Sequence, residues 1–198
     1  LARRLLRGSS LVDLDKYVIT NLGLTFGNTF VLHIKRMIDD VTVGSDLSKE
    51  YREYRERQAL AEVRDVELEV RVLTSSHWPA YKVDTFVPPP TLLTALRSFE
   101  AFYAQRNTGR SLRWLSSLGT SVVCVRFARG AYDVEMSVMQ AGVLLALSGA
   151  EGQRATIEDV ERRLGLSGRE VRDAIAPMYL ARAYALLVLC DAAGCACP

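Results

Sequence analysis

The sequence predicts an α+β protein that starts as the end of a helical bundle, continues as a small α/β unit with a short mixed or antiparallel sheet, and finishes as a winged-helix unit. Three observations lead there. Apolar residues recur at helical spacing in the first third, they alternate strictly from 66 to 72, and two short capped helix patterns meet at Gly165. We place the boundaries at 1–64, 65–148 and 149–198.

The first third has a helix followed by a second, very charged helix. One face of the first is marked by five apolar residues at helical spacing, Phe30, Ile34, Met37, Ile38 and Val41. Ser45 or Asp46 is placed to cap the second helix, which runs from Leu47 to about Ala61. The many Glu, Arg and Lys residues of that helix are typical of a solvated face with ion pairs between successive turns.

The middle of the chain begins with a half-buried strand. Its apolar face is Val66, Leu68, Val70 and Val72, while Glu67, Glu69 and Arg71 form the other face. Three prolines, Pro88 to Pro90, break the chain before a helix with apolar stripe Leu92, Leu96, Phe99 and Tyr103. Gly109 supplies the turn that ends this helix.

Three short strands are then expected, at 112–115, 122–127 and 132–136, with Gly130 in the last turn. Cys124 lies among apolar neighbours, so it is interpreted as a small core residue. Residues 138–147 are apolar all round, which predicts a fully buried helix.

The final stretch has the order helix, turn, helix, strand. Thr156 and Ser167 begin the two helices as capping-box residues, and Tyr184 to Leu189 reads as an apolar strand. Pro177 removes a helical hydrogen bond, so the second helix is expected to end or bend near Ala176.

Composition argues against several classes of function. The net charge of +2 is too small for bulk attraction to nucleic acid or membrane. The four cysteines lack paired spacing, so neither a zinc site nor a disulfide framework is expected. The sequence has no signal peptide and no apolar run of about 18 residues, so no membrane partner is expected. An intracellular, reducing location in cytoplasm and nucleus fits best, and the first residue, Leu1, suggests a fragment of a longer protein.

No catalytic constellation can be assembled. His33 and His77 are the two histidines, and neither belongs to a known catalytic motif. Asp39 and Asp40 are adjacent on a helix and point in different directions, which makes a poor carboxylate pair. We therefore predict no catalytic residues, no cofactor and no metal.

Several short motifs occur in a characteristic order. They are Leu1-Ala-Arg-Arg-Leu-Leu6, Met37-x-x-Asp40, Ser45-Asp-Leu47, Leu73-Thr74, His77-Trp78-Pro79, Phe99-x-x-Phe102-Tyr103, Gly109-Arg110-x-Leu112-x-Trp114, Leu118-Gly119 and Gln140-x-x-x-Leu144-Leu145. As an ordered set they closely resemble the cullin homology region, the scaffold end of multisubunit ubiquitin ligases. The resemblance extends to about Ala176.

The resemblance implies a non-catalytic scaffold of a cullin-RING ubiquitin ligase, acting in ubiquitin-dependent protein degradation. Its sheet would accept a strand from a RING-box protein, which recruits the ubiquitin-conjugating enzyme. The candidate interface comprises Val66, Leu68, Val70, Val72, Trp78 and Pro79. The structural signature comprises Phe99, Phe102, Tyr103, Gly109, Arg110, Leu112 and Trp114, whose aromatic members fit a hydrophobic core better than a nucleobase platform. Arg110 is expected to hold the turn after the helix.

Two alternatives stay open. The chain could be the cullin-like subunit of the anaphase-promoting complex, although the motifs that begin at Leu1 and Ser45 favour an ordinary cullin. A winged-helix protein that binds DNA is the alternative from another class, but Arg169 and Arg172 are accompanied by Glu170 and Asp173, which argues against phosphate binding.

A last candidate surface is basic. Arg162, Arg163 and Arg172 could attract an acidic segment of the ubiquitin-conjugating enzyme. Solvated arginines paired with Glu158, Asp159, Glu161 and Glu170 are the favoured interpretation. The sequence does not distinguish the cullin type, adaptor or substrate, and it assigns neither the family's modified lysine nor a role for Cys190 to Pro198.

Overall fold

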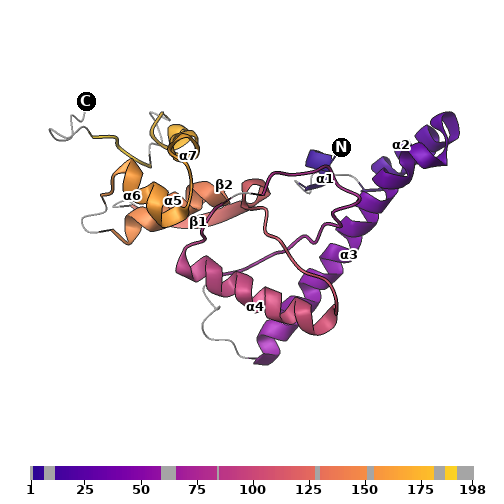
Figure 1. The fold of residues 1–198 in the computed structure, drawn as a ribbon, viewed down its shortest axis with the longest axis horizontal. Helices are drawn as coiled ribbons and strands as arrows, with labels where there is room; N and C mark the ends of the chain where they lie inside the picture. The colour runs from indigo at the N-terminus through magenta and orange to yellow at the C-terminus, as the bar shows by residue number, and fades with distance from the viewer. Residues whose placement is uncertain are drawn as a thin grey trace. The chain divides into compact units, whose positions relative to one another are not determined.

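The computed structural model describes residues 2–6, 12–58, 66–83, 85–127, 130–150, 154–180 and 186–190. These residues belong to two compact units, Leu1–Tyr81 with Thr94–Ser111, and Lys82–Leu93 with Leu112–Pro198. Helices and a two-stranded antiparallel sheet make up the described chain, which confirms the α+β class (Figure 1). The boundaries expected at 64 and 148 stay a prediction.

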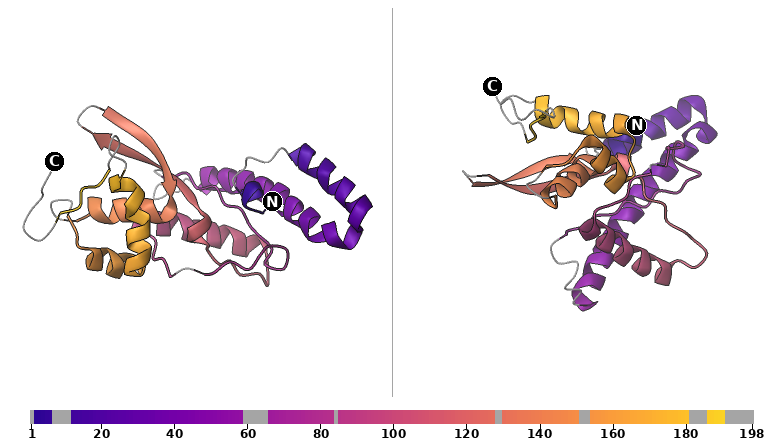
Figure 2. Two further views of the ribbon diagram at one scale, coloured as in Figure 1. Left: turned by 90° about the horizontal axis from the view of Figure 1, so that it is seen from above. Right: turned by 60° about the vertical axis from the view of Figure 1, so that its left-hand side comes forward.

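Three helices begin the first unit, namely α1 (Ala2–Leu6), α2 (Val12–Phe26) and α3 (Asn28–Gln58). Helices α2 and α3 lie side by side as an antiparallel pair in both orientations shown in Figure 2. Gly27 joins them with a φ of 89°, a conformation that favours glycine. The core of this region consists of Leu5, Ile19, Val31, Met37, Ile38 and Trp78. No helix among the described residues is both long and apolar enough to cross a membrane.

Helix α3 is continuous where the sequence predicted two helices. It passes through Ser45 and Asp46 without a break, so neither residue is a cap. Asp46 instead forms an ion pair with Lys49, with 3.4 Å between Lys49 Nζ and Asp46 Oδ1. Gly44 lowers helix stability by only about 1 kcal/mol, and the charged pairs of the following turns support continuation of the helix.

Helix α4 (Pro90–Arg106) matches its prediction closely. Pro90 occupies the first helical position, where its missing N–H costs nothing. Phe99, Phe102 and Tyr103 are buried as the stripe predicted. Gly109 follows with a φ of 79°, which explains why this position needs glycine.

The sheet of the second unit is a hairpin of β1 (Thr120–Phe127) and β2 (Gly130–Ser137), so two of the three predicted strands are confirmed. Residues 112–115 are not a strand, because no described strand pairs with them, and they lead into the 3₁₀ turn η2 (Ser116–Leu118). The prediction that Cys124 is a core residue was wrong. It is exposed, since it shares a face with Val122 and Arg126 that no described element covers.

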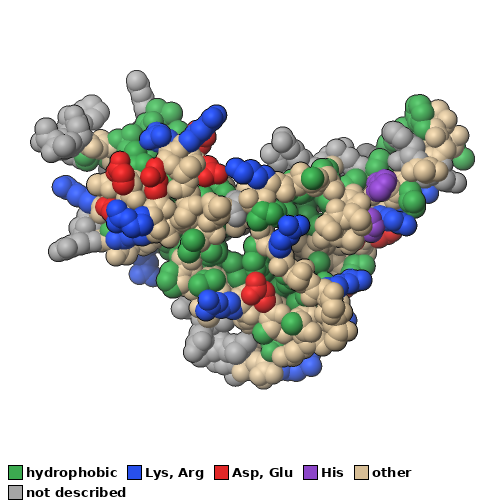
Figure 3. Space-filling view, viewed as in Figure 1, with side chains coloured by type: hydrophobic (Ala, Val, Ile, Leu, Met, Phe, Trp, Pro, Cys, Tyr) green, Lys and Arg blue, Asp and Glu red, His purple; other side chains and the backbone are tan. Residues whose placement is uncertain are grey.

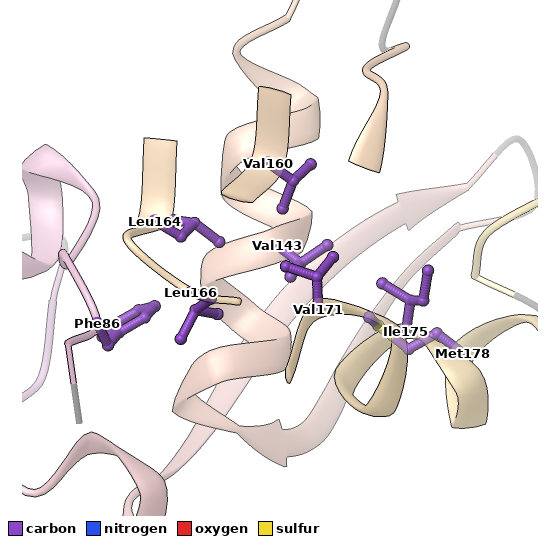
Figure 4. Packing of buried hydrophobic residues seen from close by; sticks show 8 residues of the cluster. All are labelled: Phe86, Val143, Val160, Leu164, Leu166, Val171, Ile175 and Met178. Carbon is purple, nitrogen blue, oxygen red and sulfur yellow. The ribbon is translucent and has the colours of Figure 1, made fainter. Parts of the chain in front are cut away.

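Helices α5 (Val138–Ser148), α6 (Ile157–Leu164) and α7 (Gly168–Leu180) pack against each other around an apolar core (Figure 4). Its buried members are Phe86, Val143, Val160, Leu164, Leu166, Val171, Ile175 and Met178. Capping boxes begin α5 at Ser137 and α6 at Thr156. Helix α5 is not fully buried as predicted, because Leu145 remains 38% exposed.

Helix α7 continues past Pro177 to Leu180, so it does not end near Ala176. The alternative prediction, a bend near Ala176, stays a prediction. Pro177 is exposed, and the Gln140 amide donates a hydrogen bond of 3.2 Å to the Ala174 carbonyl within the same turn. Residues 186–190 form neither a helix nor a strand, and Tyr184 lies outside the described residues. The winged-helix assignment therefore stays a prediction. Cys190 takes part in a disulfide, which the cysteine spacing did not predict.

Candidate partner-binding site

The segment from Val66 to Thr74 is extended and has two distinct faces. Val70 is buried at 7% exposure, and Val66, Leu68 and Val72 are half-buried. Glu67, Glu69 and Arg71 are exposed. The predicted alternation is confirmed, but the predicted strand is not, because no backbone hydrogen bond joins 66–73 to another described residue.

Helix α3 contacts the backbone of this segment along one edge. The Ser48 hydroxyl donates a hydrogen bond of 2.8 Å to the Val70 carbonyl. One turn earlier in the helix, a Cβ placed on Gly44 would lie 3.6 Å from the Val72 backbone nitrogen. The helix backbone thus comes close to the extended chain where glycine leaves room.

A tight turn from Thr74 to Trp78 ends the segment. The His77 N–H donates to the Thr74 carbonyl at 2.8 Å. The Asp40 carboxylate accepts hydrogen bonds from the Thr74 N–H (2.9 Å), the Thr74 hydroxyl (3.0 Å) and the Trp78 indole N–H (2.8 Å). Trp78 is 6% exposed in the core, whereas Pro79 is exposed. Of the predicted interface, Pro79 thus lies apart from the buried contacts.

His77 lies next to the same carboxylate. Its Nδ1 is 3.7 Å from Asp40 Oδ2, and its Nε2 is 3.5 Å from Arg36 Nη1. In the sequence, Asp40 is one of an adjacent carboxylate pair and the last residue of the Met37-x-x-Asp40 motif, and neither pattern predicted this role. The signal that could have drawn attention to Asp40 is its place at the end of the Met37-x-x-Asp40 motif.

Arg71 attaches the outer face of the segment to α1. Its Nη1 donates to the Leu5 carbonyl at 3.2 Å and also to the Leu6 carbonyl. These carbonyls are at the C-terminal end of α1, where helix carbonyls lack intrahelical partners. Arg71 Nη2 is also 3.7 Å from Glu69 Oε1.

The first three residues of the structural signature, Phe99, Phe102 and Tyr103, are buried aromatic core residues. The rings of Phe99 and Phe102 have centroids 5.0 and 5.4 Å from that of Tyr51, and Tyr103 stacks at 6.2 Å on Phe99. The Tyr51 hydroxyl donates to the Ala95 carbonyl at 3.4 Å. The other signature residues are less enclosed: Leu112 and Trp114 are half-buried, and Arg110 is exposed.

The three arginines of the candidate basic patch are exposed. Arg162 Nη1 is 3.2 Å from Asp159 Oδ1, and Arg163 Nη1 donates to the Ala146 carbonyl at 3.0 Å. Acidic and basic side chains are interspersed over the region of α6 and α7 in Figure 3. Arg162 therefore has the pairing that the favoured interpretation expected, while Arg172 has no ion pair within 4.0 Å among the described residues.

The hairpin offers a second feature suited to a partner. In the strand register, Phe127 and Tyr132 lie on the same face as Val123 and Val125. Both aromatic residues are exposed, at 45% and 54%, and their ring centroids are 5.9 Å apart. A two-stranded sheet has two open edges, and open edges can pair with an added strand.

Comparison with known families identifies the family to which this chain belongs. Residues 72–193 match the model of the cullin alpha+beta domain, which covers most of the chain. The chain belongs to the cullin family. The matched range includes the turn at Trp78, the hairpin and helices α5 to α7, so the resemblance based on short motifs is confirmed.

The cullin chain is similar to several cullins over nearly its whole length. It is 27% identical to human Cullin-4A over 94% of the chain, 29% identical to rice Cullin-1 over 86%, and 27% identical to Cullin-4 of Schizosaccharomyces pombe over 96%. These alignments cover 24%, 23% and 26% of the relatives. The chain thus spans about a quarter of the length of the cullins it matches.

Proposed function

We propose that this cullin chain is a non-catalytic scaffold part of a cullin-RING ubiquitin ligase, and that it binds a RING-box protein. Membership in the cullin family supports the class of function. The observation that carries the binding proposal is the segment 66–73. Helix α3 contacts one edge of its backbone, and the segment has no strand partner among the described residues.

Strand addition explains how such a segment would work. An added strand gains main-chain hydrogen bonds, and side chains at alternate positions give specificity. The main-chain groups of Val70 and Val72 on one edge already face α3, so an incoming strand would pair at the opposite edge. The outer edges of β1 and β2 have no strand partner in the part of the chain that the structure describes, and they are a second acceptor of the same chemistry.

Recruitment of the ubiquitin-conjugating enzyme follows through the RING-box protein rather than through this chain. The proposed outcome is ubiquitin-dependent protein degradation in cytoplasm and nucleus. An ordinary cullin is favoured over the cullin-like subunit of the anaphase-promoting complex, because the similar relatives are Cullin-4A, Cullin-4 and Cullin-1.

Proline substitutions test the proposal. Coexpressed RING-box protein should copurify with the wild-type chain and raise its solubility, because it covers open strand edges. The N–H groups of adjacent residues in an extended chain point to opposite edges, so Glu67→Pro and Leu68→Pro each remove a donor from one edge. One of the two should abolish copurification, whereas Glu67→Ala and Leu68→Ala should retain it.

Thermal unfolding of each free variant provides the folding control. A proline variant that keeps the midpoint of its alanine control but loses the partner supports strand addition. The proposal fails if the wild-type chain is a stable monomer without affinity for any RING-box protein, or if both proline variants bind like their controls.

A further inference from the structure

Three residues of α3 contact the extended segment at matched intervals. Asp40 contacts Thr74, Gly44 approaches Val72, and Ser48 contacts Val70. Each step of four residues along the helix corresponds to two residues along the segment in the opposite direction. Four helical residues advance about 6.0 Å, and two extended residues advance about 6.6 Å. The two repeats agree closely enough for all three contacts to form together.

The contacts differ in strength. Ser48 makes one neutral hydrogen bond, and Gly44 supplies only room for the backbone. Asp40 makes three hydrogen bonds from an ionisable group, and hydrogen bonds to a charged acceptor are about twice as strong as neutral ones. The carboxylate is therefore the main fixed point, and its side chain is only 16% exposed.

A shift of the segment by one residue would break this arrangement. The charged residues at 67 and 69 would move to the buried side, and the valines would turn outward. The Asp40 contacts oppose such a shift, because they hold both the backbone and the side chain of Thr74. The buried indole of Trp78 holds the far side of the turn to the same carboxylate.

We infer that Asp40 is a positioning residue, which sets the register of the segment 66–74 on α3 and thereby the register in which a partner strand pairs with it. This inference rests on the proposed function, since the partner strand is that of the RING-box protein. Ser48, which donates a hydrogen bond to the Val70 carbonyl, is the weaker contact between α3 and the segment. Asp40 acts through the segment and does not touch the partner.

Disulfide trapping reports the register in the free chain. A Gly44→Cys, Val72→Cys pair should cross-link under mild oxidation, because the Cβ position of residue 44 lies beside residue 72. A Gly44→Cys, Val70→Cys pair should cross-link poorly. Both pairs are made in a background in which Cys124, Cys190, Cys195 and Cys197 are replaced by serine, and the linked peptides are identified by mass spectrometry. Adding Asp40→Asn should reduce this preference, while adding the exposed neighbour change Asp39→Asn should not.

Affinity for a purified RING-box protein is the second readout. Without cysteine substitutions, Asp40→Asn should weaken binding about tenfold or more, equivalent to about 1.4 kcal/mol. Asp39→Asn should bind like wild type. Thr74→Ser retains both donors to Asp40 and should bind normally, whereas Thr74→Val removes the hydroxyl donor and should bind more weakly. Thermal midpoints of all variants are compared.

The outcomes separate the two proposals. Loss of cross-linking preference together with loss of affinity, at a thermal midpoint near that of Asp39→Asn, supports the inference. An unchanged preference in Asp40→Asn overturns it, as does a changed preference with unchanged affinity. A midpoint that falls in step with affinity, with Thr74→Val unaffected, shows a merely structural role and also overturns it. If the wild-type chain binds no RING-box protein while the preference still depends on Asp40, the proposed function fails and the positioning of the segment stands.

Discussion

Phe99 has no exposed side-chain surface and contacts the rings of Tyr51, Phe102 and Tyr103. Replacing it with alanine removes the centre of this cluster and leaves a cavity. Phe99→Ala should therefore destabilise the chain by about 3–5 kcal/mol. Trp114→Ala is the comparison, because Trp114 is also aromatic but only half-buried, and its cost should be smaller. Denaturant unfolding measures both, and equal costs would contradict the assignment of Phe99 to the centre of the core.

Two glycines that follow helices allow a matched test of backbone conformation. Gly165 follows α6 with a φ of 64°, and a Cβ there would lie 2.6 Å from the Thr85 carbonyl oxygen. Gly149 follows α5 with a φ of −85°, and the nearest atom to a Cβ would be 3.6 Å away. Gly165→Ala should therefore destabilise by more than about 1 kcal/mol, while Gly149→Ala should have little effect. The thermal unfolding midpoints of the two variants test this prediction, and similar midpoints would contradict the strain argument.

At the scale of elements, the first turns of α6 and α7 each contain a capping carboxylate whose pKa is lowered. The Thr156 hydroxyl, followed by its backbone N–H, lowers the pKa of Asp159 below its ordinary value. The Ser167 backbone N–H, followed by its hydroxyl, lowers the pKa of Glu170. In both boxes, hydrogen bonds to the ionised carboxylate favour the charged form.

These shifts predict a pH dependence. A pKa that is lower in the folded state contributes stability above the unfolded pKa, about 4 for Asp and Glu, and that stability is lost as the pH falls through the folded pKa. The wild-type chain should therefore be more stable than an Asp159→Asn, Glu170→Gln variant above about pH 5, and the difference should shrink below about pH 4. Denaturant midpoints across this range measure it, with Glu135→Gln as an exposed control. A difference that grows on acidification would contradict the capping role.

The extended segment illustrates what a pattern of residues can and cannot predict. Alternation identified which side of 66–72 is buried, because it depends only on the two-residue period. It did not identify what covers that side, because the same residues would be buried whether a helix or a second sheet covered them. The Asp40 contacts were also beyond the pattern, since they join residues separated by 34 and 38 positions. Helices α4 to α7 were predictable because their apolar spacing and their caps or end signals are local, although α7 continues past Pro177 to Leu180.

For the whole molecule, the net charge of +2 makes local charge more informative than the total. Arg162 is paired with Asp159, and acidic and basic side chains are interspersed over the region of α6 and α7 in Figure 3, so the field of this surface should be short-ranged and easily screened. Any attraction it exerts on an acidic segment of a ubiquitin-conjugating enzyme would raise the association rate more than the lifetime of the complex.

Arg172 and Arg169 make a matched pair for testing this surface within α7. Both are exposed arginines, but Arg169 is 3.8 Å from Asp173, whereas Arg172 has no described ion pair of this kind. If the basic surface contributes, Arg172→Glu should slow ubiquitin-chain synthesis by the assembled ligase at low salt by about two- to tenfold, as expected for electrostatic steering. Arg169→Glu should slow it less, and added salt should remove the difference, because screening weakens exposed charge interactions. Equal rates for wild type and both variants at low salt would leave the arginines as solvated surface, and tight, salt-sensitive binding of the wild-type chain to duplex DNA would instead favour the winged-helix DNA-binding alternative.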